Sequence, residues 1–392
     1  MNEKNKLGRR NFFRIAAAGS IGAALIPPVL IQDLNAQEKP KTEKPATNIA
    51  DAMKHPRTEN SMPGKYPGRV VRVNHPRCVA DNEPVETAAY DMISAALLTL
   101  TGAKSLKEAW LNFVTPGEVI GLKVNPVAGK LLSTSHAVTK SVVKQLTEAG
   151  IPAKDIVIWD RRQFQLEEVG FDNQNYPGIA IKGTEIKDAD GSFIDKDGIM
   201  YGEKMIDKDW YYWADYEEEY DAYTLPYMVN GGKYSYFSKI CTQEVDKIIN
   251  LPILKNAGTS VTLCLKNLAY GAITNTGRLH KHLWSETNAE VCAFPPLRDK
   301  VVLNIVDGIK GCFDGGPGAN PQFICNYNTI LVGSDPVAVD RAGYDIVIAK
   351  RIEEGVQEEE LPRGRRFMEL AEGLGLGVAD PEKINVEEIN LG

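Results

Sequence analysis

The sequence predicts an α/β fold in which a mostly parallel sheet is flanked by helices and carries an inserted flap. Apolar, strand-like runs alternate with helical patterns along most of the chain, which is typical of this class. The clearest unit has a strand at 118–125, a helix at 136–149 that ends at Gly150, and a second strand at 155–160. A strand, a helix and a strand in so few residues predict a crossover between parallel strands.

The other elements continue this alternation. We expect strands at 69–74, 246–252, 300–307 and 328–334, and helices at 85–100, 106–113, 336–350 and 365–374. Residues 161–235 break the pattern, because Asp-Gly turns and an aromatic, acidic stretch at 210–220 replace the apolar runs. We expect a flap there, whose aromatic side chains either pack the flap or face a ligand. Sheet and flap together form a single predicted domain over 69–392.

The N-terminus predicts export. Arg9 and Arg10 precede an apolar run over about 15–30, and Ala36 offers a small residue at a cleavage position. A basic start, a short apolar core and a small-residue exit form a signal peptide, and the arginine pair favours the twin-arginine route. We expect a signal peptide at 1–36, the twin-arginine translocase as a partner, and a periplasmic or otherwise exported protein. An ordinary secretory signal or an uncleaved anchor is the alternative.

Composition limits the partners and cofactors. The net charge of -7 without a basic stripe argues against nucleic acid, and a membrane is reached only through an uncleaved signal. Residues 37–68 are polar and proline-rich, which predicts a linker or a surface-hugging arm. The spacing of the six cysteines does not support a four-iron cluster, so we expect mostly buried thiols, with one disulfide possible. Nucleotide-binding glycine motifs and a G-x-S-x-G elbow are absent.

Polar side chains fall where the predicted strands end, which is where ligands bind in such sheets. Lys123 and Asn125 end the strand at 118–125, and the following loop carries Lys130, Ser133 and Ser135 at the start of a helix. Lysines and free backbone N–H groups there can hold an anion. Helix capping alone explains Ser135, but it does not explain a lysine inside an apolar strand.

The later strands bring further candidates to the same predicted edge. These candidates are Lys255, Lys266, Asn267, Asp307, Gly316, Asp335 and Asp340. A partly buried lysine can shift its pKa and act as a base or a carbonyl partner, and paired aspartates can bind a hard metal or transfer protons. A metal site made by Asp307, Asp335, His280 and His282 is one interpretation, and ordinary surface histidines are the other.

In this order the motifs resemble the domain-of-unknown-function 362 family. The motifs that carry the resemblance are Lys123-Val-Asn125, 139–150 with 155–160, 248–255, Leu265-Lys266-Asn267, Asp307-Gly308, Gly316-Pro317 and 335–340. The resemblance covers roughly 115–350. It implies an often secreted protein, and in some members a ferredoxin-type cluster module, whose cysteines this chain lacks. The reaction of the family is not generally known.

Together these patterns predict a periplasmic enzyme that acts on a small anionic substrate, with a metal or redox cofactor as possible assistance. Lys123, Lys255 and Lys266 would bind or activate the anion. The asparagines, with Ser133, Ser135 and Gly316, would orient it, and the aspartates would transfer protons or bind metal. A non-catalytic binding protein for an anionic ligand needs the lysines and asparagines only. A buried network of Lys–Asp pairs that holds the strands together is a third, purely structural interpretation.

Overall fold

The computed structural model describes residues 44–392 apart from 219–224, 230, 259 and 357–361. The predicted signal peptide therefore lies outside the described residues. Part of the predicted linker at 37–68 is packed onto the domain, since α2 (Ile49–Lys54) forms within it and Met62 is fully buried. Residues 44–68 are an arm held against the domain.

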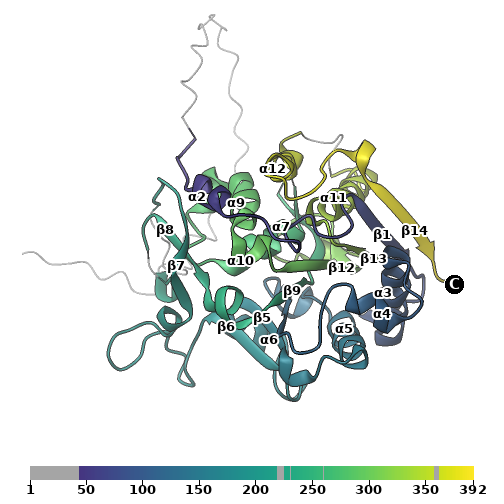
Figure 1. The fold of residues 1–392 in the computed structure, drawn as a ribbon, viewed down its shortest axis with the longest axis horizontal. Coiled ribbons are helices and arrows are strands. Elements are labelled where there is room, and N and C mark those ends of the chain that lie inside the picture. Colours follow the sequence, from purple (N-terminus) through teal and green to yellow (C-terminus); the bar gives the residue numbers. More distant parts are fainter. Residues whose placement is uncertain (1–43, 219–224, 230, 259, 357–361) are drawn as a thin grey trace, which may run out of the picture. The chain divides into compact units, whose positions relative to one another are not determined.

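One ten-stranded sheet forms the centre of the molecule (Figure 1). Its strands are β1 (Arg69–Asn74), β4 (Ile120–Lys123), β5 (Ile156–Arg162), β6 (Ala180–Glu185), β9 (Lys247–Asn250), β10 (Ile253–Ala257), β11 (Ser260–Thr262), β12 (Val301–Cys312), β13 (Ile324–Gly333) and β14 (Asn385–Asn390). The order along the sheet is β14-β1-β13-β12-β9-β4-β5-β6, and β10 pairs with β12 and β11 beside this path. The predicted α/β class is confirmed.

Helices cover both faces of this sheet. One group contains α3 (Glu86–Thr101), α4 (Leu106–Leu111) and α5 (His136–Ala149); the other contains α7 (Cys264–Ala272), α9 (Trp284–Glu290), α11 (Pro336–Glu353) and α12 (Pro362–Gly373). Three shorter helices are α6 (Gln163–Glu168), α8 (Leu279–His282) and α10 (Pro295–Arg298). Two large, separate apolar cores result, because alternate side chains of each strand point to opposite faces.

Strand direction differs from the prediction at one important place. The pairs β12–β9, β9–β4, β4–β5 and β5–β6 are parallel, as expected. In contrast, β13 runs antiparallel to both of its neighbours, β12 and β1. The chain therefore leaves β13 at the edge opposite to the one where β4 and β9 end.

The predicted flap is shorter than expected. β6 pairs with β5 inside the main sheet, so the region 161–185 belongs to the central architecture. Beyond it, β7 (Ile206–Trp213) and β8 (Tyr234–Ser238) form an antiparallel pair outside the main sheet. A last small pair joins β2 (Val79–Ala80) to β3 (Glu83–Pro84).

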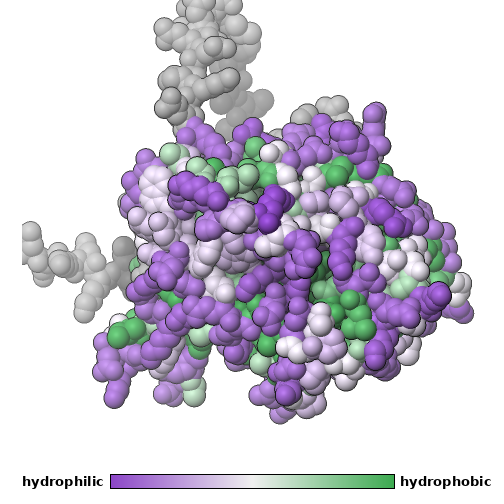
Figure 2. All heavy atoms as spheres, in the orientation of Figure 1, coloured by the Kyte–Doolittle hydropathy of each residue, from purple (hydrophilic) through white to green (hydrophobic). Residues whose placement is uncertain are grey.

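The surface is mostly hydrophilic, and the cysteines are mostly buried in the core. Hydrophilic residues cover most of the face seen in Figure 2, with only small hydrophobic areas between them. All six cysteines are free thiols, and five of them are buried. Among the described residues, no helix is both long and apolar enough to cross a membrane.

Candidate functional site

Lys123 ends β4 beneath α7, where its ammonium group is fully buried. Its Nζ donates to the Asp160 carboxylate on the neighbouring strand β5 and to Oδ1 of Asn267 at 3.1 Å. Burial lowers the pKa of Lys123, while the Asp160 carboxylate acts in the opposite direction. Space for the side chain exists because residue 271 on α7 is a glycine, where a Cβ would overlap Cε of Lys123. The structural interpretation of a buried Lys–Asp pair therefore applies to Lys123.

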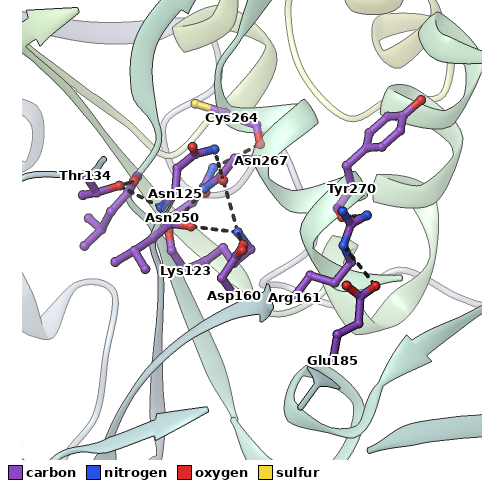
Figure 3. A network of polar contacts seen from close by, with 12 residues as sticks. Lys123, Asn125, Thr134, Asp160, Arg161, Glu185, Asn250, Cys264, Asn267 and Tyr270 are labelled. Atoms are coloured by element: carbon purple, nitrogen blue, oxygen red, sulfur yellow. Dashed lines mark hydrogen bonds and ion pairs between the residues drawn. The ribbon is translucent and has the colours of Figure 1, made fainter. Parts of the chain in front are cut away.

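Four asparagine side chains form a chain of hydrogen bonds across the strands below α7, and Figure 3 shows part of it. Asn125 Nδ2 donates to Asn267 Oδ1 at 2.9 Å, and Asn267 Nδ2 donates to Asn250 Oδ1 at 2.8 Å. Asn250 Nδ2 then donates to Asn304 Oδ1 at 2.9 Å. We call these four residues the amide chain. Because every bond runs in the same direction, each amide is held in one orientation.

Lys255 meets the Asn125 end of the amide chain, and Lys266 lines the same pocket. Lys255 on β10 is fully buried and donates from Nζ to Asn125 Oδ1 at 2.9 Å. Lys266 on α7 lies over the rings of Tyr270 and Trp284, with Nζ 5.8 and 5.5 Å from their centroids. Burial and the neighbouring Lys266 charge lower the pKa of Lys255 to about 7. Burial lowers the pKa of Lys266 to about 8.

Both lysines line a cavity of about 80 Å³, which we call the lysine pocket. Its wall also contains Asp160, Arg161 and His280. Among the described residues, Asp160 is the only acidic one in this wall, and its carboxylate already binds Lys123. Since Arg161 pairs with Glu185 at 3.4 Å, the uncompensated positive charge comes from the two lysines. A desolvated pocket of this charge favours a small anion.

His280 contributes a neutral imidazole to the lysine pocket. Its Nδ1 lies 3.0 Å from the backbone oxygen of Thr276, and a carbonyl can only accept a hydrogen bond. Nδ1 therefore carries the proton, and Nε2 keeps a lone pair. The residue as a whole is exposed, but its ring packs against Tyr270 at 4.4 Å, and desolvation of this ring, together with the charges of Lys266 and Arg161, lowers the pKa of His280 to about 4. The ring is thus uncharged at pH 7.

Asp335 and Asp340 lie away from the lysine pocket, contrary to the prediction of one shared edge. The two carboxylate oxygens of Asp335 accept backbone N–H groups at residues 68, 337, 338 and 378. Those of Asp340 accept the N–H groups of Cys264 and Leu265 at the start of α7. The antiparallel direction of β13 is the reason, since it carries 334–340 to the opposite edge. Both aspartates act as helix caps, and burial raises their pKa values to about 6 and about 7.

Asp307 lies on the other face of the sheet with Ser133 and Ser135. Its Oδ2 accepts the backbone N–H of Ser135 at 2.8 Å, and all three residues line a second, wider cavity of about 670 Å³ together with Lys130. Burial raises the pKa of Asp307. Ser135 caps α5, as one of the two interpretations predicted. These residues therefore do not meet Lys255 and Lys266.

The four predicted metal ligands do not converge. Asp307 lies beside α5, Asp335 caps α11, and His280 lines the lysine pocket. His282 is exposed and packs against the ring of Tyr216 at 4.9 Å. Within the described parts of the chain, no group of three His, Cys, Asp or Glu side chains could hold a metal ion.

Gly316 has a structural role beside the pocket. Its N–H donates to Asn256 Oδ1 at 3.2 Å, and a Cβ at this position would overlap the backbone oxygen of Asn256. Only glycine permits this close approach of two backbones. The next residue, Pro317, lines the lysine pocket, so Gly316 positions the loop that closes it.

The sequence analysis did not assign several residues of this site. Asn250 and Asn304 each stand alone in a buried, apolar strand, and this isolation was the available signal. Gly271 gave no signal, because its role is to leave space for a side chain from a distant strand. Arg161, near the end of β5, was not proposed for the site either.

The fold and the site define an α/β protein with a buried cationic pocket between its sheet and α7. Residues 216–345 match the family model described as "Domain of unknown function (DUF362)", which confirms the predicted resemblance over this part of the chain. The matched segment contains Lys255, Lys266 and His280, and Lys123 precedes it.

Other comparisons add little. A search of curated proteins finds no match to this chain. Among solved structures, a protein from Thermotoga maritima aligns with 69% of this chain and 60% of its own length, at 8% sequence identity and a TM-score of 0.33. A similarity of this size carries no argument about function.

Proposed function

We propose that this chain is an exported enzyme that acts on a small anionic substrate in the lysine pocket. One observation carries the proposal: Lys255 and Lys266 share a cavity in which the single acidic side chain among the described residues, Asp160, is already paired with Lys123. Burying the Lys266 ammonium without a free carboxylate in the pocket is costly unless a ligand compensates it. An anion supplies that compensation.

The contacts favour different roles for the two lysines of the pocket. Lys266 lies over two aromatic rings, which favour its charged form, so we assign it to the anion. Lys255 is the better base, because the Lys266 charge and burial favour its neutral form. Asn125 and Asn267 orient the ligand, because their amides are held by the amide chain.

Anion binding by matched variants tests this assignment. Calorimetry with phosphate, sulfate, acetate and lactate would measure the dissociation constant for each ion. We expect Lys266→Met to weaken the best of them at least about tenfold, which corresponds to about 1.4 kcal/mol. Lys196→Met removes the same charge from the exposed surface and is the control. Equal affinities of both variants and the unsubstituted chain would contradict the assignment.

A non-catalytic binding protein is the second candidate, and one observation favours it. Asp335 and Asp340, which were predicted to transfer protons, are occupied as helix caps, and neither lines the pocket. Lys255 and His280 then remain as the proton-transferring groups. Tight binding of an anion that is never converted, under any pH or with any co-substrate tested, would favour this candidate.

Export by the twin-arginine route is part of the proposal. The supporting pattern is Arg9-Arg10 ahead of a short apolar run. Replacement of both arginines by lysine should leave the chain in the cytoplasm, as cell fractionation would show. Unchanged export would instead indicate the general secretory route. Metal or redox assistance also stays a prediction, and elemental analysis and the visible spectrum of the exported protein would measure it.

A further inference from the structure

Lys255 and Lys266 differ in the groups that surround their amines. Lys255 Nζ meets an uncharged partner, Asn125 Oδ1, and lies in register between Cys312 on β12 and Thr262 on β11. Its side chain is fully buried, so bulk water does not stabilise an ammonium ion there. A neutral amine in this position donates one N–H to the amide and keeps its lone pair.

Lys266 is placed to stay charged. Its Nζ lies over the faces of Tyr270 and Trp284, and the negative face of an aromatic ring stabilises a cation. A lysine next to another cationic group, or in a desolvated pocket, is a recognised form of activated nucleophile. The two lysines therefore pair a nucleophilic amine with a fixed positive charge in the same cavity.

We propose that Lys255 forms a covalent imine with the carbonyl carbon of a small oxo acid whose carboxylate is held by Lys266. This inference rests on the proposed function, because it names the class of anion and the bond that the enzyme makes. It also explains why a buried amine meets an amide rather than a carboxylate, because the Asp160 carboxylate beside Lys123 favours the ammonium form and Lys255 has no such partner.

The covalent step balances without a further reactant. The Lys255 lone pair forms a bond to the carbonyl carbon, and the electron pair of the C=O π bond moves to oxygen. One proton passes from nitrogen to that oxygen, which gives a carbinolamine. Loss of the hydroxyl group and the second N–H proton as water leaves the C=N bond. One amine and one oxo acid thus give one imine and one water, with no oxidation or reduction.

His280 and the pocket size fit this step. Nδ1 of His280 is held by the Thr276 carbonyl, so Nε2 is the nitrogen that can accept a hydrogen bond from the carbinolamine hydroxyl or the departing water. A cavity of about 80 Å³ has room for roughly five to eight water molecules, since one water needs about 10–15 Å³ on this scale. This favours an acid with a similar number of non-hydrogen atoms.

Borohydride trapping tests the imine on the full-length exported chain. Pyruvate, glyoxylate and acetoacetate are the oxo acids, lactate is an anion without the carbonyl, and acetone is a carbonyl compound without the carboxylate. After reduction, we expect the peptide that contains Lys255 to gain the mass of the oxo acid less one oxygen atom. Lactate should give no adduct, and acetone at least about tenfold less than pyruvate. The buried Lys123 and the half-buried Lys300 in the same sample are internal controls, and both should stay unmodified.

Two variants sharpen the result. Lys255→Arg keeps a cation but cannot form an imine, so its adduct should disappear, and Lys266→Met should lower the adduct yield at least about tenfold. If lactate and the oxo acids bind but no adduct forms on Lys255 of the unsubstituted chain, the imine is overturned and the anion site stands. An adduct on Lys266 overturns the assignment to Lys255. If no anion binds, both the imine and the proposed function fail.

Discussion

Lys255 Nζ donates to Asn125 Oδ1 at 2.9 Å, across 130 positions of sequence. The amide is itself held by Asn267, so the amine is fixed relative to the sheet rather than to its own strand alone. Lys255 and Lys123 differ in this contact, because the amine of Lys255 meets an amide and that of Lys123 meets the Asp160 carboxylate. An amide accepts from a neutral amine and from an ammonium ion alike, so Lys255 is free to change its charge near neutral pH.

We expect Lys255 to form an imine with an oxo acid at a higher rate as the pH rises through about 7. Its pKa in the folded protein is about 7, because burial and the Lys266 charge favour the neutral amine. Asp160 and Cys312 act in the opposite direction, and Lys123 adds to the effect of Lys266. The rate of borohydride trapping with pyruvate between pH 5 and 9 measures this. A rate that only begins to rise near pH 10 would contradict a neutral Lys255.

The same shift predicts a pH dependence of stability. The folded pKa of Lys255 lies below the ordinary lysine value of 10.5, so between about 7 and 10.5 the unfolded chain binds a proton that the folded chain lacks. The free energy of unfolding therefore rises with pH in this window. In Lys255→Met this contribution is absent, and we expect a shallower rise in urea unfolding between pH 7 and 9. Parallel curves for the two proteins would contradict the shift.

Gly271→Ala should disturb the site without removing any polar group. Its Cβ would overlap Cε of Lys123, which lies in a fully buried position, so either the lysine or α7 must move. We expect a loss of about 1–3 kcal/mol in the free energy of unfolding and weaker anion binding. Gly373→Ala on α12 is the matched control, because a Cβ there meets nothing within 4 Å. Two variants of equal stability would show that Lys123 can relax.

Much of the fold and part of the site could be predicted from the sequence. A lysine inside an apolar strand identified Lys123, and the helical pattern from 136 to 149 matched α5 at both ends. Strand direction could not be read from β13, because an apolar run has the same pattern in parallel and antiparallel pairs. This is why Asp335 was placed at the wrong edge. The sequence also did not show on which face of the sheet each side chain lies. Asp307 and Lys255 lie on opposite faces and therefore do not meet.

Asp335→Ala should reduce stability but leave the pocket intact. The carboxylate accepts four backbone N–H groups, which join the start of α11 to residues 68 and 378. Loss of these bonds should lower the free energy of unfolding by about 3 kcal/mol or more. Anion affinity, measured on the folded protein at low temperature, should stay within about twofold of the unsubstituted chain. A large loss of affinity in protein that is shown to be folded would return Asp335 to the site.

Asp340→Asn should change how stability depends on pH. Asp340 holds the N-terminus of α7, which carries Lys266 and Asn267, and burial raises its pKa from 3.8 to about 7. Between these values the folded chain binds a proton that the unfolded chain lacks, so this carboxyl makes the free energy of unfolding fall as the pH rises from 4 to 7. Asparagine does not titrate, and the variant should lose this part of the decline. Urea unfolding at pH 4.5 and pH 7 measures the difference.

The control for that experiment is Asp345→Asn, at an exposed position of the same helix that pairs with Arg341 at 3.0 Å. It removes the same charge without touching α7, so its unfolding free energies should follow those of the unsubstituted chain at both pH values. Asp307 titrates in all three proteins, so its effect cancels in the comparison, whereas the charge of Asp335 raises the pKa of Asp340 and its titration belongs to the change that Asp340→Asn makes. If Asp340→Asn and Asp345→Asn show the same pH dependence, Asp340 is an ordinary ionised carboxylate and burial does not control the start of α7.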